Sequence, residues 1–361
     1  VSVTGSSGGP FTIAFGGSLS GLDVPELTAN SERLTNANLS NTITYYYDSI
    51  GQLSDIYDPA SAVVFEYDNL GRNNGLLVSL DGFGDIGFSS KYNAAGRREE
   101  LQAQFGANDF KNVYSYDNLL RLTSLKQEDV SGGNTVAEKR IEFGYNAASQ
   151  YQRIDRYADT AATEFVASSH YKYDGVNRLL QLVHAETTTA PTSGWGTDVL
   201  SGYEYAYDKS SRILSIDSYL DGLSQYGHDD TNQLIDADHT GSTDETYEYD
   251  ENGNRIMSGY NITANNQLQS DGIFNYTYDA EGNRLTRTNI STGYVTRYTW
   301  DHRNRLTTVT EEDNSTNVLQ VTENSYDAFN QWIRRNFDDD GPGGNAAVDT
   351  FFVYESGQIV L

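Results

Sequence analysis

The stretch YTYDAEGNRLTRTN, residues 276–289, is followed by YTWDHRNRLTTVT at residues 298–310. Both fit one template: an aromatic residue, Asp or Asn, two variable residues, Gly or another turn former, a polar residue such as Arg, and an apolar residue. We call the aromatic residue the anchor. The template recurs along the chain, with the anchors Tyr47, Tyr67, Tyr92, Tyr116, Tyr145, Tyr173, Tyr207, Tyr249, Tyr278, Trp300 and Tyr326.

Two weaker copies complete the set, a degenerate one at His228 and a shortened one, VYESGQIVL, at Val353. The twelve copies from Tyr47 to Tyr326 follow one another at intervals of 20 to 34 residues. A recurrence of about 20–50 residues is the signature of a stacked array, in which each copy is one supersecondary unit.

Each copy predicts a β-hairpin. Aromatic residues alternate before the turn, as at Tyr203, Tyr205 and Tyr207, and period two is the strand period. The Asp or Asn favours a turn because its side chain accepts a hydrogen bond from the backbone N–H two residues on. Gly or Asn then supplies a positive φ. The sequence therefore predicts an all-β chain, a tandem array of hairpins that forms a long antiparallel ribbon.

The anchors are interpreted as core residues of this ribbon, on which basis Tyr278→Ala should cost about 3–5 kcal/mol, as for a buried large aromatic. A recurring arginine follows the turn. We expect its guanidinium to stack on a tyrosine ring or to pair with the turn Asp of a neighbouring repeat. The arginines are Arg72, Arg121, Arg178, Arg212, Arg284 and Arg305.

The YDxxGRL pattern with aromatics upstream resembles the RHS or YD repeat over residues 41–361. That repeat occurs in bacterial RHS proteins, in the B and C subunits of insecticidal toxin complexes and in teneurins. The resemblance implies a hairpin ribbon coiled into a spiral, hollow shell, which in bacterial members often holds a toxic C-terminal domain. About thirteen repeats imply a partial shell. The family's core segment with its self-cleaving aspartate has no match here.

The predicted domains are a short β segment at 1–30, acting as a cap or the end of a preceding domain, a connector at 31–42, and the array at 43–361, which we expect to continue beyond residue 361. Loop-like inserts interrupt the array at 128–138, 185–198 and 338–347. They are rich in Gly, Thr and Asp, which is typical of loops.

The amino-acid composition limits the classes of partner that the chain can bind. Asp+Glu 51 against Lys+Arg 24 give a net charge of −27, which opposes binding to nucleic acid or to anionic lipid. The absence of cysteine excludes disulfides, and no apolar run approaches the roughly 18 residues of a membrane span. The expected location is extracellular or at a cell surface, in a bacterium.

Candidate chemistry is sparse. Five histidines show no metal-ligand spacing, and no nucleophile or nucleotide motif appears, so we assign no catalytic or cofactor-binding residue. Asp338, Asp339 and Asp340, followed by a glycine, are the metal candidates, because clustered carboxylates in a Gly loop suit calcium. The alternative is a solvated acidic loop.

Two functions fit these observations. The first is a non-enzymatic structural segment of a β-shell that encloses a delivered or C-terminal polypeptide such as a toxin. The second is an adhesive or fibre-forming surface protein whose hairpins contact a cell-surface protein, or other copies through edge strands. A glycan-cleaving hydrolase would need paired carboxylates across a cleft, and the many carboxylates here do not discriminate for it.

Overall fold

Apart from the copy at Tyr249, the copies of the template join two antiparallel strands, as the sequence predicts. The computed structural model describes residues 43–58, 60–130, 132, 136–189, 195, 196, 198–355 and 357–359, and the backbone of 2–4, 12–14 and 27–29. All regular elements among these residues are strands. The predicted connector at 31–42 lies outside the described residues, and the inserts at 128–138 and 185–198 are described in part.

The chain divides into two units. Unit 1 comprises Val1–Lys91, Gln102–Asn108 and Val295–Leu361. Its strands are β1 (Ser2–Thr4), β2 (Thr12–Ala14), β3 (Leu27–Ala29), β4 (Ile43–Tyr47), β5 (Leu53–Tyr57), β6 (Ser61–Tyr67), β7 (Asn73–Leu80), most of β8 (Gly84–Tyr92), β25 (Val295–Trp300), β26 (Leu306–Glu312), β27 (Val318–Tyr326), β28 (Trp332–Asp338), β29 (Val348–Phe351), β30 (Tyr354–Glu355) and β31 (Gln358–Ile359).

Unit 2 comprises Tyr92–Leu101 and Asp109–Tyr294, and β9 (Arg98–Phe105) and β10 (Ala107–Tyr116) cross between the two ranges. Its other strands are β11 (Leu122–Asp129), β12 (Lys139–Tyr145), β13 (Tyr151–Tyr157), β14 (Phe165–Tyr173), β15 (Leu179–Ala185), β16 (Val199–Tyr207), β17 (Ile213–Ser218), β18 (Gly222–His228), β19 (Leu234–His239), β20 (Glu245–Thr246), β21 (Tyr260–Ile262), β22 (Leu268–Asp271), β23 (Phe274–Tyr278) and β24 (Arg284–Asn289).

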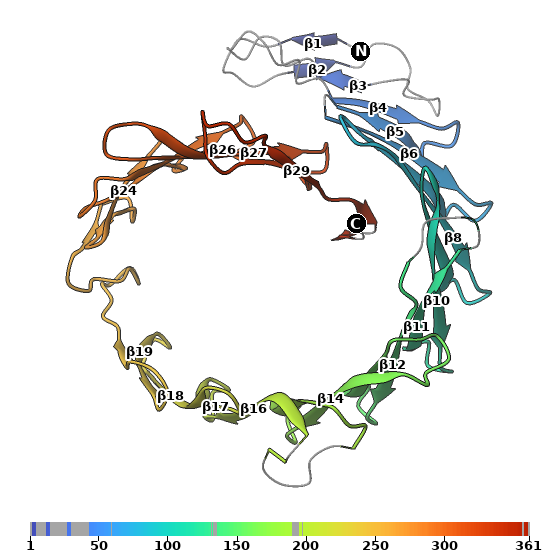
Figure 1. Ribbon diagram of the computed structural model, residues 1–361, viewed down its shortest axis with the longest axis horizontal. Coiled ribbons are helices and arrows are strands. Elements are labelled where there is room, and N and C mark those ends of the chain that lie inside the picture. The colour runs from blue at the N-terminus through green and yellow to red at the C-terminus, as the bar shows by residue number, and fades with distance from the viewer. Residues whose placement is uncertain are drawn as a thin grey trace. The chain divides into compact units, whose positions relative to one another are not determined.

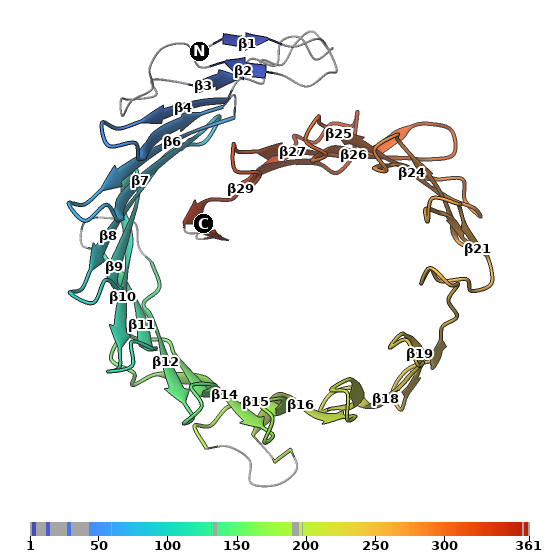
Figure 2. The same cartoon turned by 180° about the vertical axis from the view of Figure 1, so that it is seen from behind.

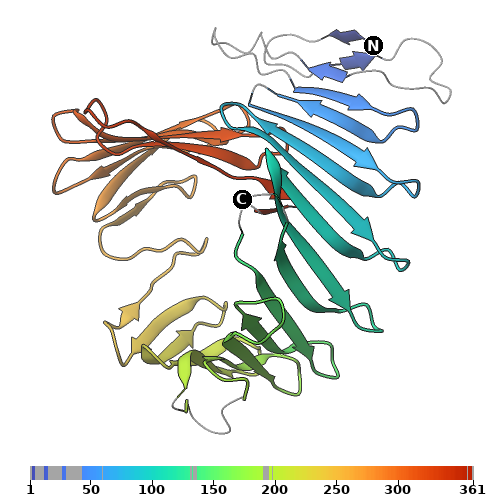
Figure 3. The ribbon, with the colours of Figure 1, turned by 45° about the vertical axis from the view of Figure 1, so that its right-hand side comes forward.

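Strands pair in chain order. In unit 1, β4 pairs with β5, β5 with β6 and β6 with β7, and the pattern repeats from β25 to β29. In unit 2 the strands from β10 to β20 follow one another along a curved path (Figures 1 and 2). The template turns of the first hairpins of unit 1 lie along one edge (Figure 3). The hairpin array predicted from the sequence is therefore confirmed.

The turn has the predicted chemistry. In the first copy, the Asp48 carboxylate accepts hydrogen bonds from the backbone N–H groups of Ile50 and Gln52, at 2.9 and 2.8 Å. Gly51 takes a φ of 84°, and the pairing register shifts between Tyr46 and Tyr47, so a β-bulge sits at the anchor. This is the three-to-four-residue hairpin loop in which a left-handed residue forms a bulge.

Some copies place an unsuitable residue in this left-handed position. Asn177, Asn232, Asn304 and Asn330 have the positive φ that was predicted for them, but Leu120 also has a φ of 61°. A branched side chain is strained there, because Cβ crowds the neighbouring carbonyl. The Leu120 side chain is 40% exposed and gains little from packing.

Leu120→Gly is expected to stabilise unit 2 by about 1 kcal/mol, because glycine adopts this conformation without the steric cost. Urea denaturation of the variant and the parent measures the change. Leu119→Gly is the matched control, since Leu119 is in the same turn and has no positive φ. A loss of stability in Leu120→Gly as large as in the control would contradict the strain assignment.

The interpretation of the anchors as core residues is wrong in part. The buried apolar side chains are mostly aliphatic, among them Ile56, Leu101 and Val183, whereas the described anchors are half-buried and Tyr47 is 39% exposed. Tyr278 is half-buried as well. Removing it should therefore cost about 2–3 kcal/mol rather than 3–5 kcal/mol, because less apolar surface returns to water.

The array is least regular around residues 247–259. Tyr249 makes only an isolated bridge with Arg255, where other anchors end a strand. The next hairpin, β21–β22, is a copy that the template search missed: in ITANNQL, Ile262 stands for the anchor and Thr263 for the Asp, and Asn266 has a φ of 58°. The signal was in ITANNQL itself, which keeps an Asn at the left-handed position and a polar residue after it.

Among the described residues the structure contains no helix long and apolar enough to cross a membrane.

Candidate functional site

The anchor hydroxyls couple successive hairpins. In most described repeats the hydroxyl donates a hydrogen bond to the backbone carbonyl of the residue that follows the preceding turn and starts the second strand of that hairpin. Eight of these bonds, 2.7–3.1 Å long, are Tyr67 to Leu53, Tyr116 to Arg98, Tyr145 to Leu122, Tyr207 to Leu179, Tyr249 to Leu234, Tyr278 to Leu268, Tyr326 to Leu306 and Tyr354 to Trp332. The anchors thus link neighbours as well as covering apolar surface.

The recurring arginine makes a second link. Arg178 donates from Nε to Oδ2 of Asp174 in its own turn at 2.6 Å, and from a terminal nitrogen to the carbonyl of Asp208 in the next turn at 3.0 Å. Its guanidinium also lies 4.6 Å from the ring centre of the next anchor, Tyr207. The predicted stacking is confirmed, but the ion pair is formed within the repeat and not with a neighbouring Asp.

The same own-turn pair joins Arg72 to Asp68, Arg121 to Asp117, Arg212 to Asp208 and Arg305 to Asp301. Arg284 was wrongly grouped with these arginines. It starts strand β24, pairs with the anchor Tyr278 and stacks on Tyr276, while Asn283 fills the turn position. The side chain that bonds to the turn Asp therefore comes from the residue directly after the left-handed residue of the turn.

These contacts keep the turn carboxylates ionised. The hydrogen bond from the Arg72 guanidinium is the main cause that holds the pKa of Asp68 below its usual range. Burial acts to raise the pKa of Asp301, but hydrogen bonds from the backbone and guanidinium of Arg305 outweigh it and lower that pKa. In the five repeats with this Arg–Asp pair, the charge of the turn carboxylate is thus matched locally.

Tyr207→Phe is expected to lower the free energy of unfolding by about 1 kcal/mol, because it removes the hydroxyl that bonds to Leu179. Tyr205→Phe is the control in the same strand, since the Tyr205 hydroxyl makes no hydrogen bond with a described residue. Urea melts of both variants provide the measurement. Equal effects would show that the anchor hydroxyl does not link the hairpins.

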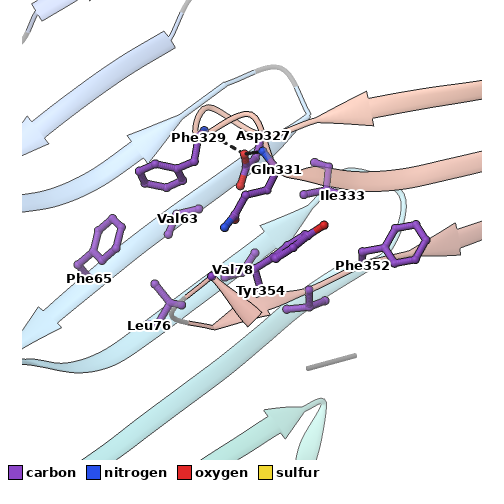
Figure 4. A pocket seen from close by; sticks show the side chains of 12 residues that line it. Val63, Phe65, Leu76, Val78, Asp327, Phe329, Gln331, Ile333, Phe352 and Tyr354 are labelled. Carbon is purple, nitrogen blue, oxygen red and sulfur yellow. Dashed lines mark hydrogen bonds between the residues drawn. The ribbon is translucent and has the colours of Figure 1, made fainter. Parts of the chain in front are cut away.

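A pocket of about 200 Å³ lies within unit 1, where the twelfth repeat meets strands β6 and β7 (Figure 4). Its walls are mostly apolar and aromatic, and they include Val63, Phe65, Phe329, Ile333 and Tyr354. The rings of Phe65 and Phe329 meet edge to face with their centres 6.3 Å apart.

Asp327, the turn Asp of the twelfth repeat, lines this pocket and is only 5% exposed. Its Oδ1 accepts the backbone N–H groups of Phe329 and Gln331, at 2.9 and 2.8 Å. Position 331 holds Gln where most complete repeats hold Arg, so no guanidinium covers Oδ2. Burial raises the pKa of Asp327 to about 6, against those two backbone hydrogen bonds. This carboxylate differs from the other turn acids in its burial, and from those with a turn arginine in its pairing.

The sequence did not single out Asp327. Two signals were available in YDAFNQW: an aromatic Phe329 at the tip of the turn, and Gln331 in place of the arginine. Both signals appear only when this repeat is compared with the other repeats. The burial of Asp327 is not visible in the repeat, because the strands that cover it, β6 and β7, lie more than 240 residues earlier in the chain.

Two of the five histidines form structural pairs with a serine. Ser169 and His184 are cross-strand partners joined by a 2.8 Å hydrogen bond, and Ser224 and His239 repeat the arrangement at the same distance. Ser169 is fully buried, so its hydroxyl is closed to a substrate. Burial, and then the charge of Arg156, lower the pKa of His184. The recurrence of the pair favours a role in joining strands.

The metal candidates lie together after strand β28. The carboxylate oxygens of Asp338, Asp339 and Asp340 fall within 4.8 Å of one another, and Asp339 is exposed. Asn345 donates its backbone N–H to Asp340 and its side-chain amide to Asp339. These contacts order an acidic loop without an ion, and calcium binding here stays a prediction.

The teneurin YD-shell family model matches residues 30–340, and the chain belongs to this family. The resemblance to the RHS or YD repeat that the sequence indicated is confirmed. The fold matches the pore state of the Tc holotoxin of Photorhabdus luminescens with a TM-score of 0.53 at 17% identity, covering 93% of this chain and 18% of that one. The TcdB2–TccC3 complex without its hypervariable C-terminal region matches with a TM-score of 0.53 at 16% identity, covering 93% and 19%.

Curated relatives match as well. The tRNA nuclease WapA of Bacillus subtilis strain 168 is 25% identical over 289 residues, which are 77% of this chain and 10% of that protein. The tRNA3(Ser)-specific nuclease WapA of Bacillus spizizenii is 23% identical over 270 residues, 72% of this chain and 9% of that protein. The chain therefore spans about a tenth of the curated relatives it matches. Its family and fold indicate a structural role.

Proposed function

We propose that this chain is a non-enzymatic segment of a YD β-shell that encloses a polypeptide. The observation that carries the proposal is the use of the repeated side chains: anchor hydroxyls and turn arginines bond to the next hairpin. Residues that recur to hold hairpins side by side build a wall, which supports a structural role. Family membership supports the same conclusion.

The enclosed partner is proposed to be an effector polypeptide of the same or an associated chain. Relatives named as tRNA nucleases match this chain over about a tenth of their length, so the matched part is one section of a larger protein. A Tc complex described as lacking a hypervariable C-terminal region shares the fold. By analogy, we place the protein outside the cell or at its surface.

A second candidate is adhesion, favoured by apolar tips on the template turns. Ile50 and Leu70 are each 77% exposed in unit 1, and Leu119 and Val176 are 69% and 68% exposed in unit 2. Each stands at the same position of its turn. Exposed apolar side chains that recur at one position of the turn suit contact with a protein partner or another copy.

Protease protection of the native, whole protein tests the enclosure. Under native conditions, a nonspecific protease is expected to spare both the hairpin array and the polypeptide it surrounds, whereas prior unfolding in urea exposes both. Mass spectrometry identifies the spared segments. The enclosure proposal fails if the array survives while every other segment is digested, and that result would favour the adhesive alternative.

A further inference from the structure

We infer that the pocket beside Asp327 is an arginine site, which binds the guanidinium of an arginine presented by another polypeptide segment. The inference deepens the proposed function by naming the chemistry of the partner, and it rests on that function only for the identity of the segment. The evidence for this arginine site is a comparison of the twelfth repeat with other repeats of the chain.

The preceding repeat shows the filled version of the site. Arg305 donates from Nε to Oδ2 of Asp301 at 2.7 Å, and its guanidinium lies 5.0 Å from the ring centre of Tyr326, the next anchor. The carboxylate and the ring thus form a niche that one guanidinium occupies. Arg178, between Asp174 and Tyr207, fills the same niche in unit 2.

The twelfth repeat has the niche without its arginine. Asp327 supplies the carboxylate, and Tyr354 stands in the next-anchor position with its hydroxyl bonded to Trp332 at 3.1 Å. Gln331 replaces the arginine, and its side chain makes no hydrogen bond with a described residue. In the eighth repeat, by contrast, the Gln233 amide reaches the turn carboxylate of Asp229 at 3.1 Å. Among the described residues, no guanidinium or side-chain amide bonds to Oδ2 of Asp327, unlike Oδ2 of Asp301 and of Asp229.

The surroundings favour a cation over a neutral guest. Asp58 adds a second negative charge near Asp327. Two arginines lie close by, but Arg305 is held by Asp301 and reaches only the backbone carbonyl of Asp327, at 3.0 Å. Arg303 bonds to the carbonyl of Ala328, at 3.2 Å. Aromatic rings attract a guanidinium through their faces, and a carboxylate binds it with directional hydrogen bonds.

The size of the pocket limits the guest. About 200 Å³ is below the roughly 300–1,000 Å³ of pockets that hold drug-sized ligands, so it suits one side chain. An arginine has the planar fork that such a carboxylate–ring niche accepts in the filled repeats, which a lysine ammonium lacks. The partner is thus a polypeptide that presents an arginine.

Binding of N-acetyl-arginine methylamide to the full chain tests the inference, with the citrulline analogue as the uncharged control. Methyl NMR signals of Val63 and Ile333 report on the pocket. We expect saturable shifts with the arginine probe and at least tenfold weaker binding of citrulline. Gln331→Arg should abolish binding by filling the niche from within, and Asp327→Asn should weaken it at least tenfold.

Both variants keep a residue that other copies of this turn already use, since Arg305 and Asn93 occupy the equivalent positions. Unchanged methyl spectra of unit 2 would verify that they fold. The inference is overturned if the arginine probe gives no saturable shift, or if Gln331→Arg binds it as tightly as the parent. Because the probe is a free small molecule, this result is independent of the protease-protection outcome.

Discussion

Gly259→Ala is expected to lower the stability of the β21–β22 hairpin by about 3 kcal/mol. Gly259 has a φ of 86°, which costs a residue with a Cβ about 1–2 kcal/mol. A Cβ at this position would also lie 2.7 Å from the Cα of Gly272, a backbone atom that cannot move aside without shifting the strand. Overpacking of this kind adds about 1–3 kcal/mol. Amide hydrogen exchange at Asn261 and Ser270 should accelerate about a hundredfold.

Gly282→Ala is the matched control. Gly282 has a φ of 89°, but its nearest neighbour would be a Gln267 side-chain nitrogen at 3.6 Å, which is ordinary contact. Its cost should stay at about 1 kcal/mol. Equal costs for the two variants would show that the close approach of Gly259 to Gly272 does not constrain the hairpin.

Asp327→Asn is expected to stabilise unit 1 at pH 7, by up to about 3 kcal/mol, and to have little effect near pH 4. Burial raises the pKa of Asp327 from 3.8 to about 6, so the folded protein binds a proton more tightly than the unfolded chain. Stability from this group is therefore complete below about pH 4 and is lost as the pH rises to about 6. A difference of about two pKa units corresponds to about 3 kcal/mol.

The neighbouring repeat supplies a control of opposite sign. Asp301→Asn should destabilise unit 1 at pH 7 by about 1 kcal/mol, because Asp301 is ionised and bonded to Arg305. Its effect should stay nearly constant from pH 7 down to about pH 4, since the pKa of Asp301 lies below the usual range and the ion pair is lost only at more acidic pH. Urea melts of each variant and the parent between pH 4 and pH 7 give both curves. A destabilising Asp327→Asn at pH 7 would refute the assignment of a buried, unpaired carboxylate.

Local chemistry made most of the fold predictable. The Asp or Asn, the left-handed residue and the period-two aromatics each act within a few residues, so every copy carried its own evidence for a hairpin. Tyr47, Tyr67 and most other anchors end a strand where the template placed them. The copy at Ile262 was missed because isoleucine and threonine replace the aromatic and the Asp while keeping their physical roles.

Contacts between repeats were less predictable. The half-burial of the anchors depends on how the hairpins stand beside one another, which a repeat motif does not encode. Arg178 pairs with Asp174 of its own turn, whereas the prediction was a pair with the turn Asp of a neighbouring repeat. The spacing of residues in the sequence does not give the direction in which a long side chain extends. The environment of Asp327 depends on strands far away in the sequence, and only its missing arginine hinted at it.

The most direct test of the central claim is a cryo-EM reconstruction of the native, whole protein. If the array encloses a polypeptide, we expect a wall of YD hairpins with additional polypeptide density on its inner side. Hairpins with no density inside, joined to neighbouring copies through their strand edges or turn tips, would contradict the enclosing role and establish a surface assembly instead.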